Sequence, residues 1–331
     1  MKTILYFYSK KMGKYIWRKV NVWFWKEATR WTAVTPWLWC PKASLDFDEK
    51  SEKVIDESSI GVIEDSFDWH VVKQWAEWSF ECNAYANAIW YILLNLFGAV
   101  STSGSSGEYT HQFSVSENNQ HQSLTIGLAD DTQDKQFPLA MIDSAEITAE
   151  TGDFVKFNCD FKSKKGTNAT LTPSYSNDFA LLWKHVQVYL ADDLASLDWT
   201  TPTQSTSVSL TISKNLEDVD VLWSVQPLDF CNTFFNVEWS IELLRDDATY
   251  QAIYMDGVKK AMRIEIVDND TTLDTWHPTL TFDLANVIMT EYAKAQDNNS
   301  LIRQTLTFRW LYSMNDNSMI TAKLINSQSA Y

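Results

Sequence analysis

Histidine and cysteine are the side chains that most often bind metals or attack substrates, and this chain contains five histidines and four cysteines. No two histidines have the spacing of a zinc site, and no cysteine lies near another along the sequence. We therefore predict reduced thiols, structural histidines, and no catalytic, cofactor-binding or metal-binding residue. The residues concerned are His70, His111, His121, His185, His277, Cys40, Cys82, Cys159 and Cys231.

The segment DNDTTLD at residues 268–274 has part of the acidic pattern of a calcium-binding loop. Leu273 stands where such a loop needs glycine, and Thr279 stands where it needs a bidentate glutamate, so we predict no calcium site. The many carboxylates leave open a hydrolase with a glycosidase-like acid pair, although no pair stands out. The sequence has no GxSxG, P-loop or GxGxxG motif, and we predict that the chain is not an enzyme.

The charge of the chain is negative and unevenly distributed. The net charge is −16, yet residues 1–30 carry eight basic side chains and one acidic side chain. The acidic remainder disfavours a general nucleic-acid binder or a protein of anionic membranes. The basic N-terminal arm either docks on a neighbouring copy of the chain or is a solvated tail.

Two apolar segments are long enough to compare with a secretory signal or a membrane-spanning helix. The N-terminal sequence MKTILYFYSKK has an apolar run of five residues, which is too short for a secretory signal. The run at residues 88–100 is shorter than a bilayer-spanning helix and is interrupted by Asn95. We therefore expect a cytoplasmic protein whose cysteines stay reduced.

One principal helix is predicted within residues 73–98. Apolar residues recur there at three- and four-residue spacing, which indicates a helix over residues 83–97 with one buried stripe. Asn83 is the expected N-cap, and Gly98 can adopt the left-handed conformation that ends a helix. Residues 285–297 are expected to form a second short helix or an irregular crossing.

Alternating apolar and polar residues predict strands over most of the remaining chain. Val155, Phe157, Cys159 and Phe161 should face the core, whereas His111 should lie on the wet face of its strand. The fold class that follows is mainly antiparallel β, with a helix packed on a sheet or β-sandwich. The predicted strands are 108–115, 123–128, 144–150, 154–162, 186–190, 208–212, 237–243, 264–266, 280–284, 306–312 and 320–324.

Composition divides the chain into an arm and one domain. Residues 1–43 are basic and aromatic, and we expect an extended arm with at most short strands. Residues 44–331 are expected to form a single β-domain. Its first part, residues 44–68, carries nine acidic residues and two lysines, which predicts a long exposed hairpin or loop.

Several stretches together resemble the major tail tube proteins of long-tailed, non-contractile bacteriophages. The resemblance covers nearly the whole chain, and its weight comes from the order and spacing of the stretches, because this family has no catalytic signature. The stretches are 20–33, 40–68, 73–98, 109–115, 123–128, 138–166, 223–244, 277–287, 304–313 and 320–331.

The resemblance implies a structural virion protein with a β-sandwich or half-barrel and one flanking helix. Six subunits would pool their strands into a ring with a continuous β-barrel, and stacked rings would form the tube that conducts the genome. Terminator, tape-measure and tail-tip proteins are the implied partners, and the host cytoplasm is the implied location before assembly. We expect an acidic lumen that lets DNA pass without specific binding. The acidic hairpin around residues 44–68 and the basic residues 1–30 are the expected contacts between subunits or rings.

Two other interpretations remain at this stage. An aromatic-rich β-sandwich could bind carbohydrate, for example as a tail-tip adhesion module, and would show a row of solvent-facing tryptophans on one sheet. A tube subunit of a genome-free, phage-derived particle would have the same sequence features as a subunit of an infectious phage.

The chain has 16 tryptophans and only nine glycines. Average usage would give about 23 glycines in a chain of this length. Trp31, Trp78, Trp223 and Trp239 stand where the family pattern has glycine, and Trp23 and Trp25 look similar. We hypothesise that UGA codons for glycine were translated as tryptophan. The alternative is an aromatic-rich variant that buries these rings at interfaces.

Overall fold

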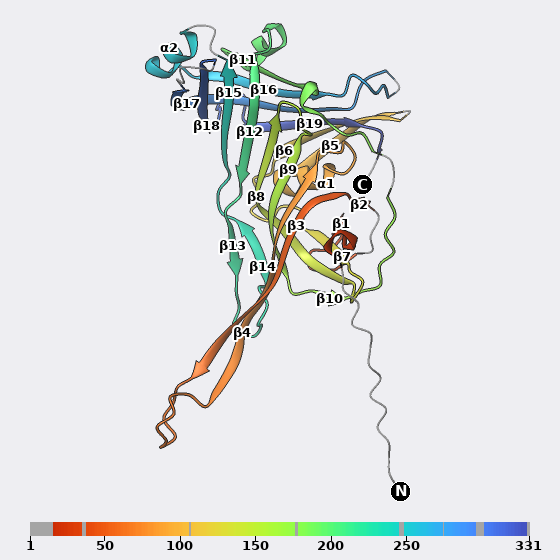
Figure 1. The fold of residues 1–331 in the computed structure, drawn as a ribbon, viewed down its shortest axis with the longest axis vertical. Coiled ribbons are helices and arrows are strands. Elements are labelled where there is room, and N and C mark those ends of the chain that lie inside the picture. Colours follow the sequence, from red (N-terminus) through yellow and green to blue (C-terminus); the bar gives the residue numbers. More distant parts are fainter. Residues whose placement is uncertain are drawn as a thin grey trace.

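The computed structural model describes residues 16–34, 38–105, 107–175, 178–244, 248–273, 275–295 and 301–329. These residues form a mainly antiparallel β body from which one long hairpin projects (Figure 1). The predicted fold class is therefore confirmed. In the described residues, no helix has the length and apolar character that crossing a membrane requires.

The first sheet has the strand order β3–β4–β9–β8–β12–β15–β18–β17, and all neighbouring strands are antiparallel. The exposed hairpin predicted at residues 44–68 is part of this sheet, since it is formed by β3 and β4. The strands are Lys42–Asp56 (β3), Asp68–Asn83 (β4), Lys135–Glu150 (β8), Lys156–Lys164 (β9), Ser205–Ser213 (β12), Asn236–Leu244 (β15), Thr279–Ala295 (β17) and Arg303–Leu311 (β18).

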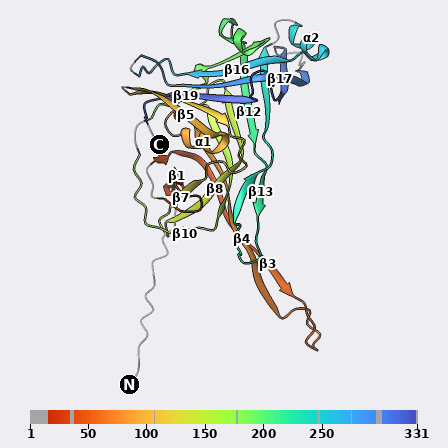
Figure 2. The same cartoon turned by 180° about the vertical axis from the view of Figure 1, so that it is seen from behind.

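The second sheet has the order β5–β6–β19–β17–β16–β11, and its strands run across those of the first (Figures 1 and 2). The long strand β17 belongs to both sheets, because its first half pairs with β16 and β19 and its second half pairs with β18. The added strands are Gly98–Ser105 (β5), Glu108–Val115 (β6), Val186–Ala191 (β11), Lys260–Val267 (β16) and Ile320–Asn326 (β19).

The prediction of a helix or irregular crossing at residues 285–297 was wrong. Asn286–Ala295 pair with β18, with a register shift between Met289 and Glu291. The shift breaks the simple alternation by which a strand is recognised in a sequence. Residues 296–297 lie outside the described part of the chain.

Residues 16–43 do not form a separate arm. They contribute β1, which pairs with β2 and β7, and Val22, Trp23 and Phe24 are buried in the body. Residues 1–15 and 35–37 of the expected arm lie outside the described residues. The remaining strands are Asn21–Lys26 (β1), Leu38–Cys40 (β2), Leu124–Ala129 (β7), Thr167–Asn168 (β10), Leu216–Val219 (β13) and Asp229–Asn232 (β14).

The principal helix, α1, spans Trp90–Phe97, and all eight of its residues are buried. It packs against β1, β5, β6 and β8 and ends, as predicted, at Gly98 with φ 82°. The other helices are α2 (Thr249–Asp256) and the 3₁₀ helices η1 (Trp17–Lys19), η2 (Trp183–His185) and η3 (Leu194–Trp199).

The predicted start of this helix at Asn83 was wrong, because Asn83 is the last residue of β4. The carboxylate of Asp178 accepts hydrogen bonds from the backbone N–H groups of Asn87 and Ala88, at 3.0 and 3.1 Å. Burial raises the pKa of Asp178, while these hydrogen bonds oppose the shift. A residue 90 positions away therefore satisfies the N–H groups before the helix, which no local pattern reveals.

The core lies where the two sheets and α1 meet. Val155, Phe157, Cys159 and Phe161 are buried there, which confirms the predicted orientation of their segment. All four cysteines fall in the described residues and are free. A hydrogen bond with Cys82 and burial both raise the pKa of the Cys40 thiol, so this thiol is unreactive at neutral pH.

Candidate functional site

The first sheet has one face in the core and one polar face. Cross-strand register places Glu77 of β4 between Asp48 of β3 and Lys162 of β9, and it places Glu238 of β15 opposite Arg309 of β18. We call this side the polar face. Its charged residues are Asp46, Asp48, Glu52, Glu77, Glu81, Glu146, Glu150, Asp160, Glu238, Glu242 and Glu291 against Lys50, Lys73, Lys156, Lys162, Lys164, Arg303 and Arg309.

Hydroxyl groups and short ion pairs connect the side chains of the polar face. Ser209 Oγ donates to Glu146 at 2.7 Å, and Ser144 Oγ donates to Asp160 at 2.8 Å. The Nζ atom of Lys50 lies 2.6 Å from Asp48. Carboxylates still outnumber cations, so the polar face presents negative charge, which repels other anions such as phosphates.

The β3–β4 hairpin extends away from the body (Figures 1 and 2), and apolar side chains are exposed at its tip beside acidic ones. Ile55, Ile60, Val62, Ile63 and Phe67 are all exposed there. Clustered exposed apolar side chains mark interaction sites in soluble proteins. The tip is therefore a candidate contact surface.

The β13–β14 ribbon and the loop that joins its strands brace this hairpin. The backbone N–H of Gln74 donates to the carbonyl of Val225 at 2.7 Å. Lys73 Nζ donates to Asp218 at 2.8 Å and to Asp220 at 2.7 Å. Partial burial opposes a charged amine, but these two hydrogen bonds raise the pKa of Lys73 overall. The direction of the hairpin is thus set by contacts near its base.

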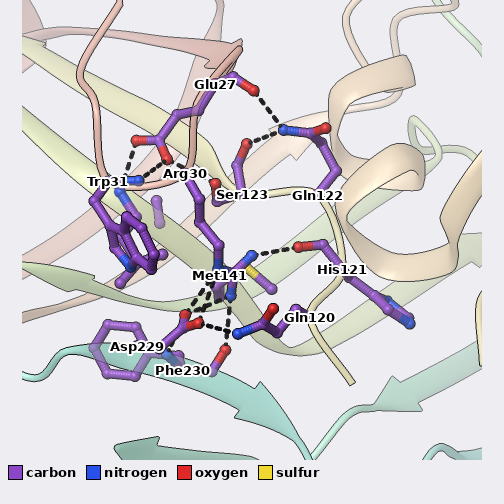
Figure 3. Close-up of polar contacts among 12 residues, drawn as sticks. Glu27, Arg30, Trp31, Gln120, His121, Gln122, Ser123, Met141, Asp229 and Phe230 are labelled. Atoms are coloured by element: carbon purple, nitrogen blue, oxygen red, sulfur yellow. Dashed lines mark hydrogen bonds and ion pairs between the residues drawn. The ribbon is translucent and has the colours of Figure 1, made fainter. Parts of the chain in front are cut away.

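Arg30 lies at the centre of a buried polar cluster (Figure 3). Its Nη2 and Nε atoms donate to Asp229 Oδ1 at 2.6 and 2.9 Å, and its Nη1 donates to the carbonyl of His121 at 2.6 Å. Gln120 Nε2 donates to the other Asp229 oxygen at 2.7 Å. These contacts tie the segment after β1 to β14, and so to the ribbon that braces the hairpin.

Glu27 is buried beside this cluster, and its carboxylate accepts four hydrogen bonds. It accepts hydrogen bonds from Ser123 Oγ at 2.6 Å and Thr125 Oγ1 at 3.0 Å. The backbone N–H groups of Leu139 and Trp31 donate to it at 2.8 and 2.9 Å (Figure 3). A buried carboxylate with four donors serves as a structural anchor.

Lys214 is a second buried ion-forming group that the sequence did not reveal. Its Nζ donates to the carbonyl of Asn95 at 2.8 Å and to Asn95 Oδ1 at 3.0 Å. Burial lowers the pKa of this amine well below its usual range, and the nearby Arg30 acts in the same direction. Asn95, the polar residue that interrupts the apolar helix, is therefore the point where α1 is attached to the end of β12.

His111 has a structural role, as expected, but the predicted wet-face position was wrong. It is fully buried, with Nδ1 2.8 Å from Thr102 Oγ1 and Nε2 3.1 Å from Asn326 Oδ1. Its strand β6 lies between β5 and β19, which supply these partners. Burial lowers the pKa of His111, so the imidazole is neutral at neutral pH.

His185, Asp268 and Asp270 are the one group of described residues that brings three potential metal ligands together. His185 Nε2 lies 3.4 Å from Asp268 Oδ1 and 3.5 Å from Asp270 Oδ2. However, His185 Nδ1 accepts a hydrogen bond from the N–H of Leu182 at 3.1 Å, so Nε2 carries the ring proton and has no lone pair for a metal. The cluster is suited to holding η2 against the 268–270 loop.

Within the described ranges, the exposed tryptophans do not form the row that a carbohydrate-binding sheet requires. They lie on separate 3₁₀ helices, on β4 and in loops. The described residues thus offer two interaction surfaces, the polar face and the hairpin tip. The buried cluster around Arg30 helps to position the hairpin tip. The exposed tryptophans are Trp17, Trp31, Trp69, Trp183, Trp199, Trp223 and Trp276.

A family model described as phage tail tube protein matches residues 17–309, which include both surfaces. Among curated proteins, none matches the chain.

Proposed function

The chain belongs to the phage tail tube protein family, and from this premise we propose that six copies form a ring and that stacked rings form the tube of a long, non-contractile tail. The observation that carries the proposal is the polar face. Five strands of the first sheet, β4, β9, β12, β15 and β18, alternate between this face and the core where they pair within the body. A wet-lumened barrel built from several subunits requires such two-faced strands.

The charge of the polar face supports a role as a conduit. Double-stranded DNA carries a dense line of phosphates, and proteins that hold DNA neutralise these phosphates with lysine and arginine. The polar face instead carries eleven carboxylates against seven cations. DNA in such a lumen would be repelled from the wall and would slide through it during genome delivery.

The hairpin is the proposed contact between rings. It projects beyond the body, and its exposed apolar tip would be covered by a subunit of the next ring. Residues 1–30 are proposed as a further contact between subunits or rings. Residues 16–30 also hold to their own subunit through Trp17, Arg30 and β1, and the Trp17 side chain stays partly exposed for such a contact.

The remaining parts of the proposal concern partners, location and chemistry. A tail tube subunit assembles with other tail proteins, and we propose terminator, tape-measure and tail-tip proteins as these partners. The subunit would collect in the host cytoplasm before it enters the virion tail. Its role is structural, because the buried charged groups of Glu27, Arg30, Asp229 and Lys214 are engaged in fixed hydrogen bonds.

Negative-stain electron microscopy across a protein concentration series tests the proposal. We expect rings, and at higher concentration tubes, with a central hole. Closed particles without a hole would contradict the conduit, and binding in a glycan screen by a protein that forms no rings would favour the carbohydrate-binding alternative. The matched control is a protein in which residues 57–67 are replaced by Asn-Gly, a two-residue hairpin turn. This variant should form rings but not tubes.

A further inference from the structure

An amine and a carboxamide are in contact inside the core. Lys214 and Asn95 are both fully buried, and Lys214 Nζ lies 3.0 Å from Asn95 Oδ1. The carbonyl carbon Cγ of Asn95 is only one C=O bond, about 1.2 Å, beyond that oxygen. The amine can therefore reach this carbon by a small movement, in a site from which bulk water is excluded. This pair does not depend on the function proposed above.

Four hydrogen bonds fix the orientation of the Asn95 carboxamide. Its Nδ2 donates to the backbone carbonyls of Gln122 and Ala140, at 2.8 and 3.2 Å. Its Oδ1 accepts from the backbone N–H of Ile142 at 2.8 Å, in addition to Lys214 Nζ. Because acceptors meet Nδ2 and donors meet Oδ1, it is the carbonyl side of the amide that faces the lysine. The Ile142 N–H can stabilise the negative charge that Oδ1 acquires when a nucleophile adds to Cγ.

The surroundings of the Lys214 amine favour its neutral, nucleophilic form. Among the described residues, Nζ has two hydrogen-bond acceptors, which are the backbone carbonyl and Oδ1 of Asn95. A neutral amine has two N–H donors and one lone pair, whereas an ammonium ion would bury a third N–H group without an acceptor. Burial lowers the pKa of Lys214, and the nearby Arg30 acts in the same direction. A lysine that is desolvated in this way is an activated nucleophile.

Adjacent residues of β8 position the two groups. The carbonyl of Asp143 accepts a hydrogen bond from the Lys214 backbone N–H at 2.8 Å, and the N–H of its neighbour Ile142 binds the Asn95 carboxamide. Reactants held in this way behave as if highly concentrated, with effective concentrations of about 10⁵–10⁸ M where the alignment is good. The fold therefore supplies the proximity that two free side chains in water lack.

We propose that Lys214 and Asn95 form an isopeptide bond after the chain has folded. The lone pair of Nζ attacks Cγ, and an electron pair of the C=O bond moves onto Oδ1. One proton passes from Nζ to Nδ2, the Cγ–Nδ2 bond breaks as the C=O bond forms again, and ammonia leaves. The product is a secondary amide, and the reaction consumes no oxidant or other reactant.

The bond joins α1 covalently to the residue that follows β12, across 119 positions of sequence. Until it forms, hydrogen bonds hold these two elements together and the amine can still titrate, so freshly folded protein keeps a free lysine. The two groups are far apart in sequence, and only the folded chain brings them into contact. The result is a subunit whose core helix cannot detach from the sheet.

Mass spectrometry of the purified, folded full chain tests the proposal. We expect the intact mass to be lower by the mass of one ammonia molecule, either on purification or after storage for several weeks. Proteolysis should then yield joined peptides that contain residues 95 and 214. On a denaturing gel, the product should migrate faster than the unmodified chain, because the loop between these residues stays closed. An unchanged mass, or a loss of ammonia without the joined peptides, would overturn the proposal.

The matched control is Lys214→Met, which keeps a long side chain and removes the nucleophile. This variant should retain the full mass. Wild-type protein that is purified in guanidinium chloride and never refolded should also retain it, and this second control serves even if the variant folds poorly. Loss of ammonia from either control would show a reaction that does not need both the lysine and the fold, such as cyclisation of an asparagine onto its own backbone. That result would overturn the proposal.

Discussion

Arg30 and Asp229 form a buried, two-point hydrogen-bonded ion pair across 199 positions of sequence. Only 4% of the Asp229 side chain is exposed, and the pair joins the segment after β1 to β14 (Figure 3). Because the guanidinium also donates to two backbone carbonyls, its position is fixed from several directions. The base of the hairpin is held indirectly by this pair, since β14 belongs to the bracing ribbon.

Arg30→Met should lower the free energy of unfolding by about 3–5 kcal/mol, because it leaves the Asp229 carboxylate buried without its cation. The measurement is urea unfolding followed by circular dichroism. Arg303→Met is the matched control, since its partner is Glu242 and half of the Arg303 side chain is exposed. That change should cost less than about 1 kcal/mol. Equal effects would mean that the buried pair contributes no more than a surface pair.

Trp31→Gly should stabilise the protein. Trp31 has φ 70°, a left-handed conformation that costs a residue with a Cβ atom about 1–2 kcal/mol relative to glycine. The backbone N–H that donates to Glu27 is retained, and a cation–π contact with Lys164, worth about 0.5 kcal/mol, is lost. The net gain in the free energy of unfolding should be about 0.5–1.5 kcal/mol.

The matched control is Trp75→Gly, because Trp75 has the extended backbone of a regular strand, where glycine has no conformational advantage. It lies in β4, and its Nε1 donates to Glu77 at 2.8 Å. Glycine there should destabilise the strand by about 1 kcal/mol or more. If both changes lower the free energy of unfolding, then position 31 does not favour glycine.

The surroundings of the tryptophans at suspected glycine positions bear on the hypothesis that UGA codons for glycine were translated as tryptophan. Trp23 lies directly opposite Gly127 in β7, and its buried indole nitrogen has no partner among the described residues; the Trp239 nitrogen is in the same situation. Trp78 is well accommodated, since its Nε1 donates to Ser163 at 3.1 Å. We expect UGA codons and glycine-containing peptides from native virions at positions 31 and 239. UGG codons at positions 31, 78, 223 and 239 would end the hypothesis.

Lys214 should make stability depend on pH. Burial lowers the pKa of Lys214 in the folded protein, so the unfolded chain binds the extra proton below about pH 10.4. The neutral Lys214 amine therefore contributes its full stability to the folded protein above that pH. This stability is lost as pH falls toward the pKa of Lys214 in the folded protein. The slope reaches about 1.4 kcal/mol per pH unit.

The Lys214→Met variant isolates this contribution from the other titrating groups. Urea unfolding of both proteins from about pH 6 to pH 9 should show the wild type gaining stability relative to the variant as pH rises. Parallel curves would show that the amine titrates normally in the folded protein.

The strands were largely predictable, because alternation in β9, β12 and β15 reports directly which side chains meet the core. What the sequence could not show was set by distant partners. Asp178 caps the approach to α1 from 90 positions away, and the bulge in β17 hides a strand within a helix-like pattern. Glu27, Arg30 and Lys214 look like ordinary surface charges in a sequence, since only the fold brings their partners to them.

The apolar tip of the β3–β4 hairpin should be required for tubes and dispensable for folding. Ile60→Asp with Ile63→Asp places two charges where the next ring is proposed to cover the tip. Both residues are exposed in the subunit, so the free energy of unfolding should change by less than about 0.5 kcal/mol. Tube formation, counted by electron microscopy, should be lost because each buried and unpaired carboxylate opposes the contact.

Ile60→Val with Ile63→Val is the matched control, because it keeps both side chains apolar, and it should still form tubes. Normal tubes from the aspartate variant would show that rings stack through another surface.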